Sequence, residues 1–294
     1  MKHFHQMVCA SLVSTETGAN FPLIMPEMVH RGDGSAKNDC ERNALMRLLP
    51  DLRREHPHLR MAILLDGLHG KAPQLRRLRE LGMNFIIGVK RNDHVVLYEQ
   101  IELDGESREF TDTDGTVHSF RWRNGAELND SNRDVLVNAV SCTEFTPERR
   151  VRKAGGRFVV RPGKRTSFGW ITDFEIEPSK LMAMMRAGRA RWRIENEMFN
   201  VMKNKGMNLS HNYGHGNRNL SSVLVGLMVL TFLIDQIQER CCRVYQVARR
   251  KFSSKTSLWD LMRAHLRIRH LSGWDDLMLR IAGKRSRSPP SASA

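Results

Sequence analysis

Hydrophobic residues in the first ninety positions alternate between the pattern of strands and that of amphipathic helices. The expected elements, in order, are a hairpin from 7–13 and 21–25 around Gly18, a helix over 40–55 capped by Asn38 or Asp39 and kinked at Pro50, a strand over 61–65, a helix through Leu75, Leu78 and Leu81, and a strand over 85–89. The strand–helix–strand part predicts two parallel strands joined by a crossover helix.

From residue 92 to 173 the pattern changes to a period of two, which is typical of strands. Asp114 and Gly115 separate two alternating runs, a strong hairpin signal. Helical patterning resumes at about 178, continues through 203 and returns over 220–249. The longest apolar run, 223–234, is shorter than the roughly 20 residues that cross a bilayer, so it predicts a core helix and no membrane association.

Charge narrows the class of partner. The chain carries 47 Lys and Arg against 32 Asp and Glu, a net charge of +15, which favours a polyanion. Residues 180–294 hold 21 basic and 7 acidic residues, whereas the first 179 hold 26 and 25, so we expect nucleic-acid affinity mainly beyond residue 179. The five cysteines, without a C-x-x-C spacing, argue against a disulfide framework or zinc ribbon and fit a reducing cytoplasm.

Two places carry candidate chemistry. Asp66 follows the 61–65 strand, at the edge where functional side chains emerge from a parallel sheet, although an ordinary Asp-Gly turn explains it equally well. In the 191–203 helix, Arg191 lies about 40° and Lys203 about 80° from Glu195 around the axis. One face therefore offers an acid between two bases, for which a solvated face with i,i+4 ion pairs is the alternative.

The run Arg191-Trp192-Arg193-Ile194-Glu195, followed by Phe199 and Lys203, resembles the helix that supplies the last catalytic carboxylate in DDE transposases of the insertion-sequence-four type. The signature of that family is Tyr-x2-Arg-x3-Glu-x6-Lys, and Asp66 resembles its second carboxylate. The resemblance spans roughly residues 7–249 and implies an α/β fold with a ribonuclease-H-like mixed sheet and flanking helices. The implied parts are a core without its first strand over 1–91, a β-rich insertion over 92–173, helices completing the core over 174–249, and basic helices with a tail over 250–294.

The same resemblance implies metal-dependent DNA end cleavage and strand transfer in transposition. Asp66 and Glu195 would hold Mg²⁺ or Mn²⁺, whose two-ion arrangement activates the attacking oxygen and stabilises the leaving one. Arg191 and Lys203 would contact DNA phosphates. The implied partners are element ends and target DNA, bound by a homodimer in the bacterial cytoplasm, with no small-molecule substrate.

Three features depart from the family pattern. The signature Tyr falls at Gly188, and Lys203 follows Glu195 by eight positions instead of seven. Glu197 is therefore a rival for Glu195, although Lys203 would lie about 120° from it. The first Asp of the family has no counterpart, because the strand that carries it would precede residue 7.

The missing acid leaves the function open between alternatives. With an incomplete triad, we expect the chain to be inactive in end cleavage on its own. A truncated derivative that only binds DNA or the parent enzyme is the first alternative. A ribonuclease-H-like nuclease unrelated to mobile elements is the second, and it would require a complete triad within the chain.

Overall fold

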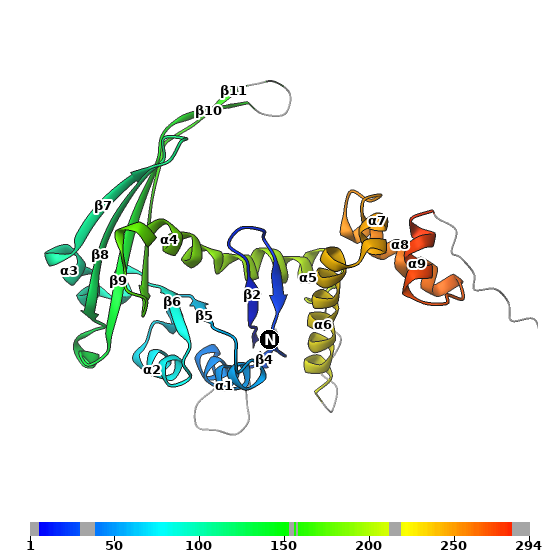
Figure 1. The fold of residues 1–294 in the computed structure, drawn as a ribbon, viewed down its shortest axis with the longest axis horizontal. Helices are drawn as coiled ribbons and strands as arrows, with labels where there is room; N and C mark the ends of the chain where they lie inside the picture. The colour runs from blue at the N-terminus through cyan, green and yellow to red at the C-terminus, as the bar shows by residue number, and fades with distance from the viewer. Residues whose placement is uncertain (1–5, 30–38, 153–155, 157, 212–218, 284–294) are drawn as a thin grey trace, which may run out of the picture. The chain divides into compact units, whose positions relative to one another are not determined.

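The computed structural model describes residues 6–29, 39–152, 156, 158–211 and 219–283. By its internal contacts the chain divides into two compact units. Unit 1 contains Met1–Met28 and Arg193–Ala294, and unit 2 contains Val29–Trp192. Figure 1 labels the elements of both units, which are described separately below.

Unit 2 is built on a six-stranded sheet with the order β5-β6-β12-β9-β8-β7. Its strands are β5 (Ala62–Leu65), β6 (Asn84–Gly88), β7 (Glu106–Thr111), β8 (Val117–Glu127), β9 (Leu136–Thr146) and β12 (Lys164–Thr172). Only β5 and β6 run parallel in this sheet, joined through α2 (Ala72–Glu80), which confirms the predicted strand–helix–strand unit. The sheet is therefore mixed, and the α/β class is confirmed.

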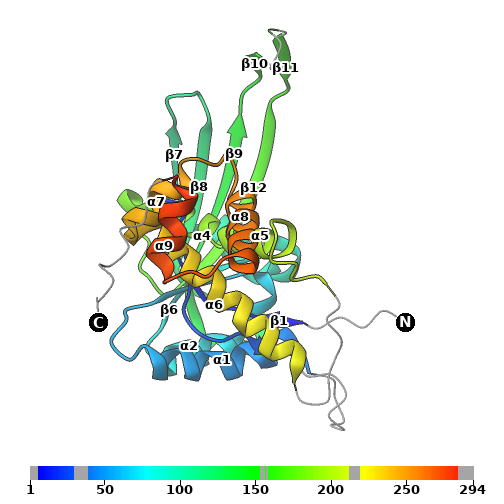
Figure 2. The same cartoon turned by 90° about the vertical axis from the view of Figure 1, so that its right-hand side faces the viewer.

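The β-rich segment continues this sheet. Ile171 of β12 pairs with Ile87 of β6 in antiparallel register, which joins the segment to the parallel strands. The hairpin predicted at Asp114 and Gly115 is confirmed as β7 and β8. Beyond the ends of β9 and β12, the strands β10 (Arg149–Arg152) and β11 (Phe158–Arg161) form a separate two-stranded sheet (Figures 1 and 2).

Helices cover both faces of the sheet. α4 (Leu181–Ala190) packs on one face in a core that includes Phe120, Trp122, Trp170 and Met185. On the other face, α3 (Val95–Asp104) contacts β8 and β9. Single turns of 3-10 helix complete the unit: η1 (Gly67–His69), η2 (Arg91–Asp93), η3 (Asp130–Asn132) and η4 (Pro178–Lys180).

The first helix of unit 2, α1 (Glu41–Glu55), differs from its prediction at its start. Its N-cap residue is Cys40, without a side-chain cap, and Asp39 instead forms an ion pair with Arg47 at 2.8 Å. The helix contains Pro50 and ends at Glu55 as predicted, and the kink at Pro50 stays a prediction. The apolar face was predicted correctly, because Leu45, Leu48 and Leu49 are buried.

Unit 1 begins with two short antiparallel pairs. β1 (Met7–Val8) pairs with β4 (Glu27–Met28), and β2 (Ser11–Val13) pairs with β3 (Asn20–Pro22), which confirms the predicted hairpin. The helices that follow are the π-helix η5 (Ile194–Phe199), α5 (Asn200–Asn204) and α6 (Leu220–Cys241). Their common core contains Met198, Met202, Val229 and Phe232.

Three further helices of unit 1, α7 (Arg243–Arg249), α8 (Lys255–Ile268) and α9 (Trp274–Ile281), share a second core. Asp235 of α6 ties them to the preceding helix. Its carboxylate accepts hydrogen bonds from the Tyr245 hydroxyl at 2.5 Å and the Trp259 indole at 3.1 Å. Lys255 Nζ lies 2.7 Å from the same carboxylate, so this buried charge is fully paired.

α6 is longer than the apolar run that predicted it. At 22 residues it is long and apolar enough to cross a bilayer, a criterion that the core helices of soluble proteins also satisfy. One side is buried at Val229 and Phe232, as expected of a core helix. On the other side, large apolar residues remain exposed at the spacing of a heptad: Leu220, Val223, Leu227, Leu230, Ile234 and Ile237.

Candidate functional site

Asp66 lies where β5 ends and η1 begins. Its Oδ1 accepts a hydrogen bond from the backbone N–H of Leu68 at 3.1 Å, so the side chain caps the 3-10 turn. The residue is exposed, and no described residue donates a hydrogen bond to its Oδ2. The Oδ1 atom of Asp66 therefore has the structural role of an ordinary Asp-Gly turn, which was the alternative interpretation of this residue. The Oδ2 atom is available to a ligand.

Glu195 belongs to a π-helix, a local structure that the sequence pattern did not predict. The backbone N–H of Asn200 donates to the carbonyl of Glu195, five residues back, where an α-helix would bond four residues back. A turn at Arg191 precedes this segment. The helical segment predicted from about 178 through 203 is confirmed, but a turn interrupts it at Arg191 and it is a π-helix over Ile194–Phe199. A turn that closes over five residues accommodates one residue more than an α-turn.

The additional residue changes the angle between Glu195 and Lys203 around the helix. If the π-turn absorbs one position, their separation of eight positions acts as seven, and Lys203 lies about 20° from Glu195 around the axis. The corresponding angle from Glu197 is about 140° by the same arithmetic. Among the two candidate acids, Glu195 is therefore the one that shares a helix face with Lys203.

The hairpin β2–β3 holds the start of this π-helix within unit 1. Arg193 donates from Nη2 to the carbonyl of Thr15 at 3.0 Å, and the buried Asn20 donates from Nδ2 to the carbonyl of Arg193 at 3.3 Å. Gly18, at φ +70°, lies under the Arg193 guanidinium, 3.1 Å from where a Cβ would sit. The fully buried Met198 anchors the inner side, so both sides of the segment are fixed.

Gly188, the position where the resemblance would place the signature tyrosine, packs closely against a buried tryptophan. In α4, a Cβ at Gly188 would lie 2.7 Å from Cδ1 and Cε2 of the Trp170 indole. Trp170 is buried and stacks on Phe168 with ring centroids 5.7 Å apart. The indole occupies the space that a side chain at 188 would need, so this position requires glycine.

The predicted site residues divide between the units. Glu195 and Lys203 belong to unit 1, where Lys203 Nζ lies 5.8 Å from the Phe199 ring centroid. Asp66 and Arg191 belong to unit 2, where the Arg191 guanidinium lies 5.5 Å from the Trp192 ring centroid. Across the described parts of the chain, no group of three or more His, Cys, Asp or Glu side chains is arranged to hold a metal ion. The meeting of Asp66 and Glu195 stays a prediction.

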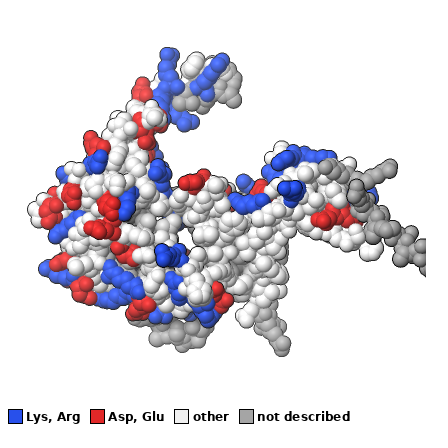
Figure 3. Space-filling model, in the orientation of Figure 1, with Lys and Arg blue, Asp and Glu red and all other residues white. Residues whose placement is uncertain are grey.

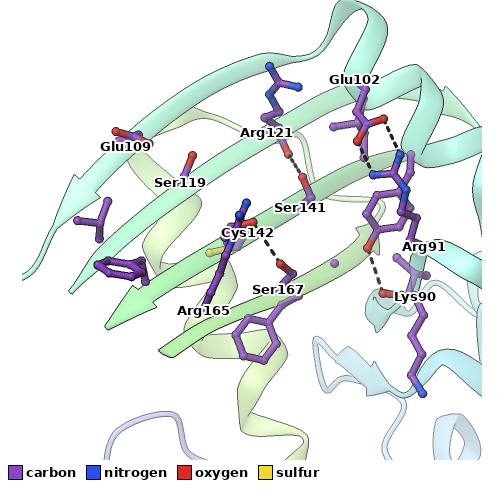
Figure 4. A pocket seen from close by; sticks show the side chains of 18 residues that line it. Lys90, Arg91, Glu102, Glu109, Ser119, Arg121, Ser141, Cys142, Arg165 and Ser167 are labelled. Atoms are coloured by element: carbon purple, nitrogen blue, oxygen red, sulfur yellow. Dashed lines mark hydrogen bonds and ion pairs between the residues drawn. The ribbon is translucent and has the colours of Figure 1, made fainter. Parts of the chain in front are cut away.

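Sequence reasoning missed a hollow of about 890 Å³ on the sheet of unit 2, beside α3 (Figure 4). Three hydroxyls cross it in one row, because Thr143 of β9 pairs with Ser119 of β8 and with Ser167 of β12. Tyr98 of α3 packs at one end over Gly169, where a Cβ would lie 2.9 Å from the Tyr98 Cζ. The alternation of small polar residues along β8, β9 and β12 was the signal for this face.

Basic side chains flank the hydroxyl row. Arg121 and Arg165 project along it from β8 and β12, are exposed and form no ion pair with any described residue (Figure 4). Arg91, in contrast, donates to Glu102 at 2.7 Å, and this hydrogen bond lowers the pKa of the Glu102 carboxyl. The hollow therefore offers two unpaired guanidinium groups and neutral hydroxyls, a combination that suits phosphate and sugar oxygens.

Comparison of the chain with models of known protein families and with curated protein sequences finds no match.

Proposed function

We propose that the chain is a DNA transposase of the DDE class, which cleaves element ends and transfers strands with the help of Mg²⁺ or Mn²⁺. Asp66 and Glu195 hold the metal, and Arg191 and Lys203 contact DNA. The observation that carries the proposal is the π-helix at Ile194–Phe199. In the family signature the Lys follows the Glu by seven positions, whereas Lys203 follows Glu195 by eight. A π-turn that takes up one residue would bring the two side chains back to the relative position that the signature implies.

The donor groups fit a hard divalent cation. Carboxylate oxygens are the ligands that Mg²⁺ prefers, and Asp66 and Glu195 are both exposed. The Oδ2 of Asp66 also accepts no hydrogen bond from the described residues. A bound ion would activate the attacking oxygen and stabilise the leaving one in an in-line displacement. The family uses three acids, so the proposal requires a third carboxylate besides these two, and we expect no end cleavage from the chain without it.

The DNA partner is supported by charge and by the hollow on the sheet. A net charge of +15 favours a polyanion, and Arg121 and Arg165, which form no ion pair with a described residue, lie beside a row of hydroxyls. Side chains of this kind contact phosphate and sugar oxygens in protein–DNA complexes. A homodimer acting in the bacterial cytoplasm remains part of the same proposal.

Iron-mediated cleavage of the polypeptide tests the metal site without requiring catalysis. Fe²⁺ substitutes for Mg²⁺, and with ascorbate and peroxide it generates radicals that cut the backbone close to the bound ion. In the full chain we expect cuts near residue 66 and near residue 195, both suppressed by excess Mg²⁺. Asp66→Asn and Glu195→Gln should each abolish both sets of cuts. Glu197→Gln, two positions away, is the matched control and should leave them intact.

Two results would contradict this assignment. Cuts confined to one of the two segments would show that the acids do not share an ion, and loss of cutting in Glu197→Gln alone would transfer the role to Glu197. If no Mg²⁺-sensitive cuts appear and the chain still binds DNA, the result would favour another candidate function, that of a truncated derivative which binds DNA without catalysis. That candidate is supported by the cap that Asp66 forms on η1, an ordinary structural role.

A further inference from the structure

The extension of the sheet by β10 and β11 is strongly basic. Residues 149–165 contain eight Lys and Arg and no Asp or Glu, and the other residues up to 179 contain 18 basic and 25 acidic ones. Figure 3 shows Lys and Arg gathered on this extension, beyond a body whose surface mixes both signs. We call the two strands, Arg149–Arg152 and Phe158–Arg161, the basic arm.

Two prolines separate the basic arm from the main sheet. Between the pair Thr146–Lys164 and the pair Arg149–Arg161, the ladder is interrupted by Pro147 on one strand and Pro162 on the other. Proline has no backbone N–H to donate, so cross-strand bonding lapses here and resumes as an independent two-stranded ribbon. The ribbon consequently stands beyond the end of the sheet with both of its faces open to solvent (Figure 1).

Arg149 fixes the base of the arm. Its guanidinium donates to the Thr116 hydroxyl at 2.8 Å and lies 2.8 Å from the Asp114 carboxylate, both at the tip of the β7–β8 hairpin. The pKa of Asp114 is lowered, chiefly by hydrogen bonds from Thr116 and further by Arg149. Arg149 is thus committed to a structural contact, which distinguishes it from the other arginines of the arm.

The remaining described arginines of the arm have no acidic partner. Arg150, Arg152 and Arg161 are exposed, and none forms an ion pair with a described residue. Arg150 and Arg152 instead flank Phe158, with their guanidinium carbons 5.8 and 6.0 Å from its ring centroid. Phe158 is itself 60% exposed, which is costly for an isolated protein in water and is typical of a contact surface.

We propose that the basic arm is a DNA-binding element that enters the major groove of duplex DNA. A two-stranded ribbon, with strands about 4.8 Å apart and side chains on both faces, fits a groove about 12 Å wide. Alternation along the strands sets Arg150 and Arg152 on one face and Arg161 on the other, so a ribbon inserted between the two walls of the groove directs guanidinium groups at the phosphates on both sides. The major groove of A-form RNA is too deep and narrow for such a ribbon.

This inference deepens the proposed function by assigning part of the DNA contact to unit 2. Binding is measured with a fluorescent 20-base-pair duplex in EDTA, so that the outcome does not depend on a metal site. For the full chain, the salt dependence of the association constant is compared between wild type and the triple variant Arg150→Gln, Arg152→Gln, Arg161→Gln. Loss of three phosphate contacts should reduce the slope of log K against log salt by about 2.7, with a large loss of affinity at low salt.

A control variant distinguishes the effect of the arm from the effect of the chain's net charge. Arg60→Gln, Arg76→Gln and Arg133→Gln remove the same charge from exposed positions elsewhere in unit 2, and should change the slope by less than one. The triple variant with lysine instead of glutamine at positions 150, 152 and 161 should keep most of the wild-type slope of log K against log salt. Methyl green, a major-groove ligand, should compete with binding.

Three results would overturn the proposal. One is an equal slope change in the arm variant and the control variant. Another is competition by the minor-groove ligand distamycin but not by methyl green. The third is binding of an RNA duplex as tightly as DNA. Failure of iron-mediated cleavage at Asp66 and Glu195 would leave these results unaffected, so the two hypotheses fail separately.

Discussion

Gly188 allows a direct test of the close packing between α4 and Trp170. In an exposed helix interior, Gly→Ala stabilises a protein by about 1 kcal/mol, because alanine loses less backbone entropy on folding. At Gly188 this gain is opposed by Trp170, since a Cβ would lie 2.7 Å from two atoms of the indole ring. Trp170 is buried against α4 and stacked on Phe168, so it has little room to move.

In Gly188→Ala, the free-energy cost of overpacking against Trp170 should exceed the gain in helix propensity. Forcing an added methyl group into a well-packed core costs about 1–3 kcal/mol, and a rigid buried neighbour places Gly188→Ala at the upper end. After subtraction of the propensity gain, we expect a net loss of about 2 kcal/mol. Gly188→Tyr, a far larger side chain at the same position, should prevent unit 2 from folding normally.

Gly226 of α6 is the matched control. A Cβ there would meet the end of the Met25 side chain, with Sδ at 2.8 Å, but Met25 is 57% exposed and flexible. Gly226→Ala should therefore be neutral or stabilising by up to about 1 kcal/mol. The local opening free energies are measured by hydrogen exchange at increasing urea. For Gly188→Ala the exchange is followed in peptides from α4 and β12, and for Gly226→Ala in peptides from α6. Equal or greater protection of α4 and β12 in Gly188→Ala would refute the packing argument.

Two further substitutions test the cores of the two units. Asp235→Ala leaves Tyr245 and Trp259 without their common acceptor, while Lys255 keeps its ion pair with Glu239 at 2.7 Å. The free energy of unfolding in urea titrations should fall by about 1–3 kcal/mol for each donor left unsatisfied, whereas Asp235→Asn, which keeps an oxygen, should cost less. A similar loss in both variants would contradict the role of the acceptor. In unit 2, burial lowers the pKa of His94, and Lys71 lowers it further while Asp93 raises it. The unfolded state therefore binds the proton first, so stability should fall as the pH drops below about 6.5, by at most about 1.4 kcal/mol per pH unit. His94→Leu should flatten that part of the urea-midpoint profile, and an unchanged profile would exclude His94 as its source.

Elements with a strong local pattern were predictable from the sequence. The parallel pair β5 and β6, the β7–β8 hairpin and the buried face of α1 all follow from periodicity and turn residues. The hollow beside α3 was not predictable, because it depends on the register that aligns Ser119, Thr143 and Ser167 across three strands. Register depends on pairing between segments far apart in the chain, which a local pattern does not encode.

The site residues show a similar division. The candidates Asp66 and Glu195 could be selected from strand and helix patterns, but their local structure could not. The cap that Asp66 forms depends on the 3-10 turn after it, and the π-turn at Glu195 depends on how Met198 and Arg193 pack against α6 and the hairpin. A count of residues along an assumed α-helix put Lys203 about 80° from Glu195, whereas an absorbed residue reduces the angle to about 20°.

The near neutrality of the first 179 residues concealed the basic arm for a physical reason. A sum over that span averages the segment 149–165, which has eight basic and no acidic residues, with a remainder that is net acidic. DNA does not respond to such a sum, because salt screens exposed charges beyond about 8–10 Å. Two acidic residues stand at the base of the arm: Asp114, which contacts Arg149, and Glu148, which precedes Arg149 in the chain. The two strands of the arm contain no acid, so the arm presents a local excess of positive charge to a polyanion. A charge count made to find such elements should therefore use windows the length of a single hairpin.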